Sequence, residues 1–417
     1  MRKLRKIATV VSTLTLAAAA LAGTANTASA SGPVTLEATY TSVSDGWTQV
    51  ERWYDSNSGY VPAQYTSDGR LDQTGQRATF FGSSRPAAGR YLLSYAPGWN
   101  TNSKPVPVLL VPGAYETADS AWANPTDGTM GCGATTCPTT GMMQSLSSAG
   151  YKAFGITFPQ VVGDNYDHAE QIADAIRTIK TRTGSSQVDV VSWSMGTLAA
   201  RLYVSNNHQS WGSAYGGDVR KLVLMGGPNN GWDYTFRHGT YPAVAAYPEC
   251  GGSVIGGVAA IKQNCYGMTY SHPELTAYST AGGDFFPGIR QMLKRWDATY
   301  PLNAANPDGK TTYNGGTGLF GQSYGIDYAI NQGSLISTMR ANAVPASVNT
   351  YLLCGNSPTI PNWNNETDGP SDGTILLASC TDTGGISTVS GSATLAVNHL
   401  QLTLSSSSVN QITSWLG

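Results

Sequence analysis

Charged residues are scarce in this chain. Of its 417 residues only 12% are Asp, Glu, Lys or Arg, and the formal net charge at pH 7 is −2. Proteins that bind nucleic acids usually carry a basic face, so this composition argues against a nucleic-acid partner. The chain also has no Cys-x-x-Cys pair and no cluster of histidines near its cysteines, so we expect neither a metal site nor a cofactor.

Long apolar runs are missing after the first 30 residues, so we expect no membrane anchor. The first 30 residues differ, because basic residues between Arg2 and Lys6 precede an apolar run over residues 7–23. Ala28-Ser29-Ala30 then supplies a small-residue cleavage site. This pattern predicts a signal peptide over residues 1–30 and a secreted protein, which we expect to be monomeric.

The chain has six cysteines, which in an exported protein are most simply three disulfides. Proximity in the sequence suggests the pairs Cys132–Cys137, Cys250–Cys265 and Cys354–Cys380. The sequence by itself does not determine this connectivity.

No linker rich in proline or charge divides the mature chain, so we predict one large domain with insertions. Residues 31–104 form a β-rich N-terminal extension, whose predicted strands include Ala78–Phe81. Residues 105–417 then alternate strands and helices, which indicates an α/β fold with a mostly parallel sheet and helices on both faces. The alternation stops over about 232–345, where we expect a cap inserted over the carboxyl ends of the strands.

A strand, a tight turn and a helix are predicted around Ser194. Residues 188–191 are an apolar β-branched run, and from Met195 onward the apolar residues follow the helical period. Ser194 lies between small Ser192 and Gly196, as a nucleophile elbow requires, although the usual pattern has Gly at the first position. A helix N-cap is the alternative role for Ser194.

A second strand, at residues 107–111, ends in a turn that contains Gly113. Backbone amides at the carboxyl ends of strands can face a developing oxyanion, as can the amide that follows the nucleophile. We therefore predict that Ala114 and Met195 form an oxyanion hole. Tyr115 remains an alternative to Ala114.

A nucleophilic serine needs a histidine base and a carboxylate that orients it. Of the histidines that follow Ser194, only His399 comes after the last core strands and just before the terminal helix. Asp368 and Asp372 both follow the penultimate strand, and we prefer Asp372 because apolar residues re-enter the core directly after it.

These motifs resemble the secreted bacterial lipases of the α/β-hydrolase superfamily, especially the class 2 lipases. The matching pieces are Val111-Pro112-Gly113-Ala114, Gly150-Tyr151, residues 188–201, Gly227-Pro228-Asn229-Asn230-Gly231, Ser371-Asp372-Gly373 and Asn398-His399-Leu400. They cover less than half of the chain. Two departures concern specificity, since the family usually has His in place of Pro112 and Gly-His in place of Ser192-Trp193.

The resemblance implies an α/β-hydrolase fold and a serine hydrolase that cleaves carboxylic esters, as a lipase or carboxylesterase. Its catalytic residues would be Ser194, Asp372 and His399, and its substrate a lipid or another partly apolar acyl ester. An amidase or peptidase on the same fold would use the same residues. A non-catalytic extracellular protein that binds lipid or polymer is a further alternative.

Overall fold

The computed structural model describes residues 33–65, 69, 71–127, 130–238, 263–265, 268–270, 285–303, 309–317, 322–323 and 325–417. The predicted signal peptide at 1–30 lies outside these residues, and so does Cys250 of the predicted Cys250–Cys265 disulfide.

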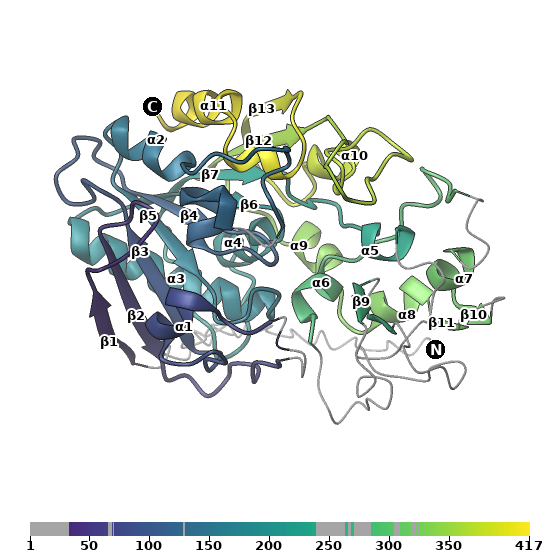
Figure 1. The fold of residues 1–417 in the computed structure, drawn as a ribbon, viewed down its shortest axis with the longest axis horizontal. Helices are drawn as coiled ribbons and strands as arrows, with labels where there is room; N and C mark the ends of the chain where they lie inside the picture. The colour runs from purple at the N-terminus through teal and green to yellow at the C-terminus, as the bar shows by residue number, and fades with distance from the viewer. Residues whose placement is uncertain are drawn as a thin grey trace, which may run out of the picture.

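A nine-stranded sheet forms the centre of the molecule, in the order β1-β2-β3-β5-β4-β6-β7-β12-β13 (Figure 1). The strands are β1 Val34–Tyr40, β2 Gln49–Asp55, β3 Arg90–Tyr95, β4 Val108–Val111, β5 Ala153–Thr157, β6 Val188–Trp193, β7 Val219–Met225, β12 Asn349–Gly355 and β13 Val389–Leu395. From β5 to β13 neighbouring strands run parallel, whereas β1, β2 and β3 add antiparallel pairs at the other edge.

Helices cover both faces of this sheet. On one face α3 (Asn165–Thr183) packs against α4 (Gly196–Val204), and on the other α2 (Met142–Ser148) packs against α11 (Ser406–Leu416) (Figure 1). Successive side chains of a strand point to opposite faces, and accordingly Val190 belongs to the first core and Val191 to the second. The strand order and the two helical layers confirm the predicted α/β-hydrolase fold.

One predicted strand is wrong. Ala78–Phe81 belongs to α1 (Gly75–Phe81), a helix that ends at Gly82 in the left-handed conformation with a φ of 71°. Its last two residues, Phe80 and Phe81, are both buried and pack with Val50 of the neighbouring strand β2. Four residues are too few to separate the helical period from the strand period, so packing of this short apolar run decided its conformation.

Short elements follow β7 in place of the regular alternation. They are α5 Tyr234–Arg237, β8 Gln263–Cys265, β9 Met268–Tyr270, α6 Pro287–Gln291, α7 Gly309–Asn314, β10 Gly316–Thr317, β11 Gln322–Ser323, α8 Gly325–Asn331 and α9 Ile336–Ala341. Figure 1 shows α5 to α9 grouped on the side of the molecule away from β1. Trp232, at the start of this region, pairs with Leu293 in a parallel bridge.

Candidate active site

The turn between β6 and α4 places Ser194 in a strained conformation. Its φ is 53°, a region that residues with a side chain seldom adopt. The Ser194 N–H donates to the carbonyl of Met225 at 2.9 Å, and its own carbonyl accepts from Thr197 N–H at 3.0 Å. These bonds hold the sharp strand-to-helix turn that is characteristic of a nucleophile elbow.

Small residues surround this turn because other segments approach it closely. A Cβ at Gly196 would lie 2.3 Å from the carbonyl oxygen of Pro112, and one at Gly113 would lie 2.7 Å from Ser194 Cβ. Ser192 fits where the family pattern has Gly, since it is fully buried in β6 and its hydroxyl donates to the carbonyl of Val223 at 3.1 Å. The departure from the usual motif is therefore accommodated by a hydrogen bond.

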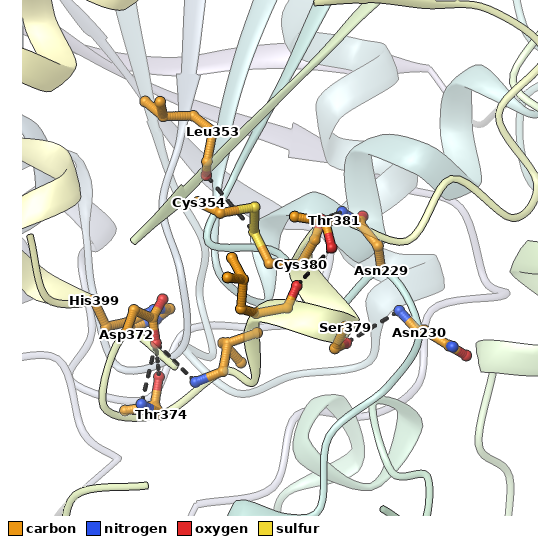
Figure 2. Close-up of a disulfide and its surroundings, with 12 residues drawn as sticks. Asn229, Asn230, Leu353, Cys354, Asp372, Thr374, Ser379, Cys380, Thr381 and His399 are labelled. Atoms are coloured by element: carbon orange, nitrogen blue, oxygen red, sulfur yellow. Dashed lines mark hydrogen bonds and ion pairs between the residues drawn. A yellow bond between two sulfur atoms is a disulfide. The ribbon is translucent and has the colours of Figure 1, made fainter. Parts of the chain in front are cut away.

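The structure brings the three predicted residues Ser194, His399 and Asp372 together. His399 Nε2 lies 2.9 Å from Ser194 Oγ, and Nδ1 lies 2.7 Å from Asp372 Oδ2. A carboxylate only accepts, so Nδ1 carries the proton and Nε2 is left to accept from the hydroxyl. Asp372 is itself oriented, because its Oδ1 accepts from the backbone N–H groups of Thr374 at 3.1 Å and Ile375 at 2.8 Å (Figure 2).

Asp368, the alternative acid, has a different partner. Its Oδ2 lies 2.8 Å from Nη1 of Arg237. Of the other histidines that follow Ser194, His208 contacts the carbonyl of Gln209, His238 contacts Glu366, and His272 lies outside the described residues.

The backbone amides of the candidate oxyanion donors, Ala114 and Met195, differ from that of Tyr115 in their hydrogen bonding. Tyr115 N–H already donates to the carbonyl of Val161 at 3.1 Å. No hydrogen bond within the described part of the chain uses the backbone N–H of Ala114 or of Met195. Met195 is the N-cap residue of α4, where the helix dipole also favours a negative charge. Among the described residues, Ala114 rather than Tyr115 therefore offers an amide without a partner near Ser194.

A cavity of about 270 Å³ opens beside Ser194 and His399. Its wall is mostly apolar and aromatic and includes Met130, Trp193, Trp232, Tyr234, Ile289, Met292 and Trp363. Elements that follow β7 contribute much of this wall. Such a cavity suits a ligand with a sizeable apolar part and a reactive group at one end.

Trp193 supports His399 in a way that the sequence did not indicate. Its indole ring is 3% exposed and its centroid lies 5.1 Å from that of the imidazole. Its Nε1–H donates to the backbone carbonyl of His399 at 3.2 Å. Trp193 thus contributes both to the cavity wall and to the placement of His399.

Two predicted disulfides are confirmed, and both lie close to the site. Cys354–Cys380 joins the end of β12 to the end of α10 (Leu377–Cys380), and the loop between them carries Asp372 (Figure 2). Cys132–Cys137 closes a small loop whose Gly133 carbonyl accepts from the side chain of Asn398 at 2.7 Å. The disulfides therefore restrain the segments next to Asp372 and His399.

One group of carboxylates is close enough to share a cation. Oxygen atoms of Asp55, Glu170 and Asp174 lie within 4.8 Å of one another, and all three residues are buried. Arg177 pairs with Glu170 and Asp174, so a protein cation already contacts this group. Burial raises the pKa of both Asp55 and Asp174, which favours their neutral forms.

Among the described helices, none combines the length and apolar character needed to cross a membrane. No protein-family model matches the chain, and a search of curated proteins found no relative. Solved structures similar to it include mature Bacillus licheniformis lipase BlEst2, with 14% identity, a TM-score of 0.38, and coverage of 75% of this chain and 91% of that one. Pyrococcus furiosus esterase Pf2001 matches with 10% identity, a TM-score of 0.35, and coverage of 75% and 80%.

Proposed function

We propose that this protein is a secreted serine hydrolase that cleaves carboxylic esters, with Ser194 as nucleophile, His399 as general base and Asp372 as the orienting acid. The observation that carries the proposal is the continuous contact from Ser194 Oγ through His399 to Asp372, at 2.9 Å and 2.7 Å. Ser194 and His399 line an apolar cavity, where an acyl group can be held.

Acylation follows from these contacts. As the Ser194 hydroxyl attacks the ester carbonyl, its proton passes to His399 Nε2, and Asp372 stabilises the imidazolium that forms. The negative charge on the carbonyl oxygen is stabilised by the amides of Ala114 and Met195. His399 then gives the proton to the departing alcohol, which leaves an acyl group on Ser194.

Deacylation repeats the steps with water. His399 accepts a proton from the water as it attacks the acyl-enzyme, and returns that proton to Ser194 as the acid leaves. Neither acylation nor deacylation requires a metal or cofactor, and the protein returns to its starting state after each turnover.

The apolar wall supports a substrate with a partly apolar acyl group, such as a lipid or a related carboxylesterase substrate. Export is supported by the basic, apolar and small-residue segments at 1–30, and by disulfides of the kind that persist outside the cell. We expect the protein to act as a monomer without a membrane anchor.

A fluorophosphonate probe and a series of nitrophenyl esters test the proposal. Ser194→Ala should lose labelling and lower kcat by about 10³-fold or more. Ser192→Ala is the matched control, because this serine lies two residues away and its hydroxyl donates to the carbonyl of Val223 rather than contacting His399. Labelling of Ser194→Ala, or its full turnover, would end the proposal. Faster cleavage of anilides than of esters would indicate an amidase, and a wild-type protein that binds lipid without labelling would indicate a binding protein.

A further inference from the structure

Arg237, the last residue of α5, lies at the centre of a buried ion-pair network. Its side chain is 1% exposed, with Nη2 2.8 Å from Asp233 Oδ2, Nε 3.3 Å from Glu366 Oε2 and Nη1 2.8 Å from Asp368 Oδ2. Nη1 also donates to the carbonyl of Tyr300 at 2.8 Å. A planar guanidinium can reach several acceptors in fixed directions, which a single ammonium group cannot.

Two of these carboxylates belong to the loop that carries Asp372. The Glu366 N–H donates to the carbonyl of Gly373 at 2.8 Å, and the Ser371 hydroxyl donates to the carbonyl of Glu366. Glu366 is thereby bonded to both neighbours of Asp372 in the chain. A contact that holds Glu366 also holds the backbone on either side of the Asp372 carboxylate.

The segment that ends at Arg237 also forms part of the cavity wall. Trp232 and Tyr234 line the cavity, and the Trp232 Nε1–H donates to the carbonyl of Thr374 at 2.8 Å. Thr374 in turn donates its N–H to Asp372 Oδ1 at 3.1 Å. One short segment therefore contacts the Asp372 loop before and after the carboxylate while its aromatic side chains face the ligand space.

We propose that Arg237 is a positioning residue. It holds the Asp372 loop in the position in which Asp372 reaches His399, and it links this loop to the aromatic wall of the cavity. This inference rests on the proposed esterase function. Arg237 touches no reacting atom, and it acts through Glu366 and the backbone around Asp372. Loss of the Arg237 ion pairs should therefore change the orientation of Asp372 more than it changes binding of the ester.

Three variants test this role. Glu366→Gln removes one charge, Arg237→Lys keeps the charge but loses the planar fork, and Arg237→Met removes both. Small shifts of catalytic groups cost up to about 10²-fold in rate, so we expect Glu366→Gln to lower kcat by about tenfold with little change in KM. Arg237→Lys should lie between Arg237→Met and the wild type.

Arg295→Met is the matched control. Arg295 also pairs with two carboxylates, Asp297 at 2.7 Å and Asp327 at 2.6 Å, but within the described part of the chain it neither lines the cavity nor contacts the Asp372 loop. Its replacement should leave kcat at the wild-type value. All rates are measured well below the unfolding temperature of each variant, so that a loss of stability does not appear as a loss of rate.

A second readout does not depend on ester turnover. The proton that His399 Nδ1 donates to Asp372 should give a downfield resonance in protein with isotopically labelled histidine, assigned by its loss in His399→Gln. We expect this resonance to broaden or shift in Glu366→Gln and Arg237→Lys but not in Arg295→Met. Folded variants with wild-type kcat and an unchanged resonance would overturn the inference, and if Arg237→Met does not fold, the other two decide. A wild-type protein without ester turnover would end the proposed function, while the resonance would still test the positioning.

Discussion

The indole Nε1–H of Trp193 donates to the backbone carbonyl of His399, across 206 residues of sequence and 3.2 Å of space. Trp193 is the last residue of β6 and directly precedes Ser194. The strand that presents the candidate nucleophile therefore also supports the candidate base. This contact gives a structural reason for a tryptophan at a position where the lipases that the chain resembles usually carry histidine.

Replacing Trp193 should separate these two roles. Trp193→Phe keeps an aromatic ring in the cavity wall but removes a hydrogen bond worth about 1 kcal/mol, so we expect kcat to fall about fivefold. Trp193→Ala should also destabilise the fold by about 3–5 kcal/mol, because it leaves a void in the core. Trp415→Phe is the control, since Trp415 is not among the residues that line the cavity and instead stacks on Tyr351 with ring centroids 5.0 Å apart. Wild-type turnover of Trp193→Phe would contradict the supporting role.

The two acids of the loop should respond very differently to loss of charge. Asp372→Asn should lower kcat by about 10⁴-fold, because an amide group can stabilise the wrong tautomer of His399 and cannot stabilise its imidazolium. Asp368→Asn should cost less than about tenfold, since Asp368 contacts Arg237 and reaches His399 only through the loop. Kinetics on one nitrophenyl ester compare them, and equal losses would contradict the assignment of Asp372.

The disulfides should contribute unequally to stability. Cys354 and Cys380 are 26 residues apart, which in the chain-entropy treatment corresponds to about 3.5 kcal/mol. Cys132 and Cys137 are 5 residues apart, which corresponds to about 2 kcal/mol. Thermal unfolding of the two double alanine variants, without reductant, should therefore give a larger loss for the pair around Asp372. The reverse order would contradict this expectation.

Glu116, two residues after Ala114, should make stability depend on pH. Its side chain is buried, and desolvation raises its pKa from the ordinary 4.5 to about 7, although Ser120 and the backbone of Met130 act to lower it. Between pH 4.5 and about 7, the folded protein therefore keeps Glu116 protonated, whereas the unfolded chain has released this proton. The associated stabilisation is complete below pH 4.5, is lost as pH rises toward about 7, and amounts to about 3 kcal/mol.

Glu116→Gln removes this titration while keeping the shape of the side chain. Its free energy of unfolding should fall less between pH 5 and about 8 than that of the wild type. Other buried acids act in the same direction, as Asp167 does with a pKa raised by burial to about 9, so the difference between the two proteins is the quantity to measure. Parallel pH curves would contradict an ionising Glu116.

Local patterns predicted much of the sheet and the elbow. Val188–Trp193 is a strand and Gly196–Val204 a helix, as the change from β-branched run to helical period indicates. Elimination along the chain predicts His399 as the candidate base, since it alone follows the last core strands and directly precedes the terminal helix. Prediction from periodicity failed at Ala78–Phe81, because four residues carry too little periodic signal to distinguish a helix from a strand.

The sequence by itself determined the features that depend on neighbours in the chain. These are the small residues around Ser194. Proximity in the sequence only suggests the cysteine pairs, and the tertiary structure decided Cys132–Cys137 and Cys354–Cys380. Only the tertiary structure decided which carboxylate reaches His399, which amide after Gly113 has no partner among the described residues, and that Arg237 and Trp193 contact the segments of the site. Each of these depends on contacts between segments far apart in sequence, whose distances of about 3 Å arise from packing and leave no local pattern.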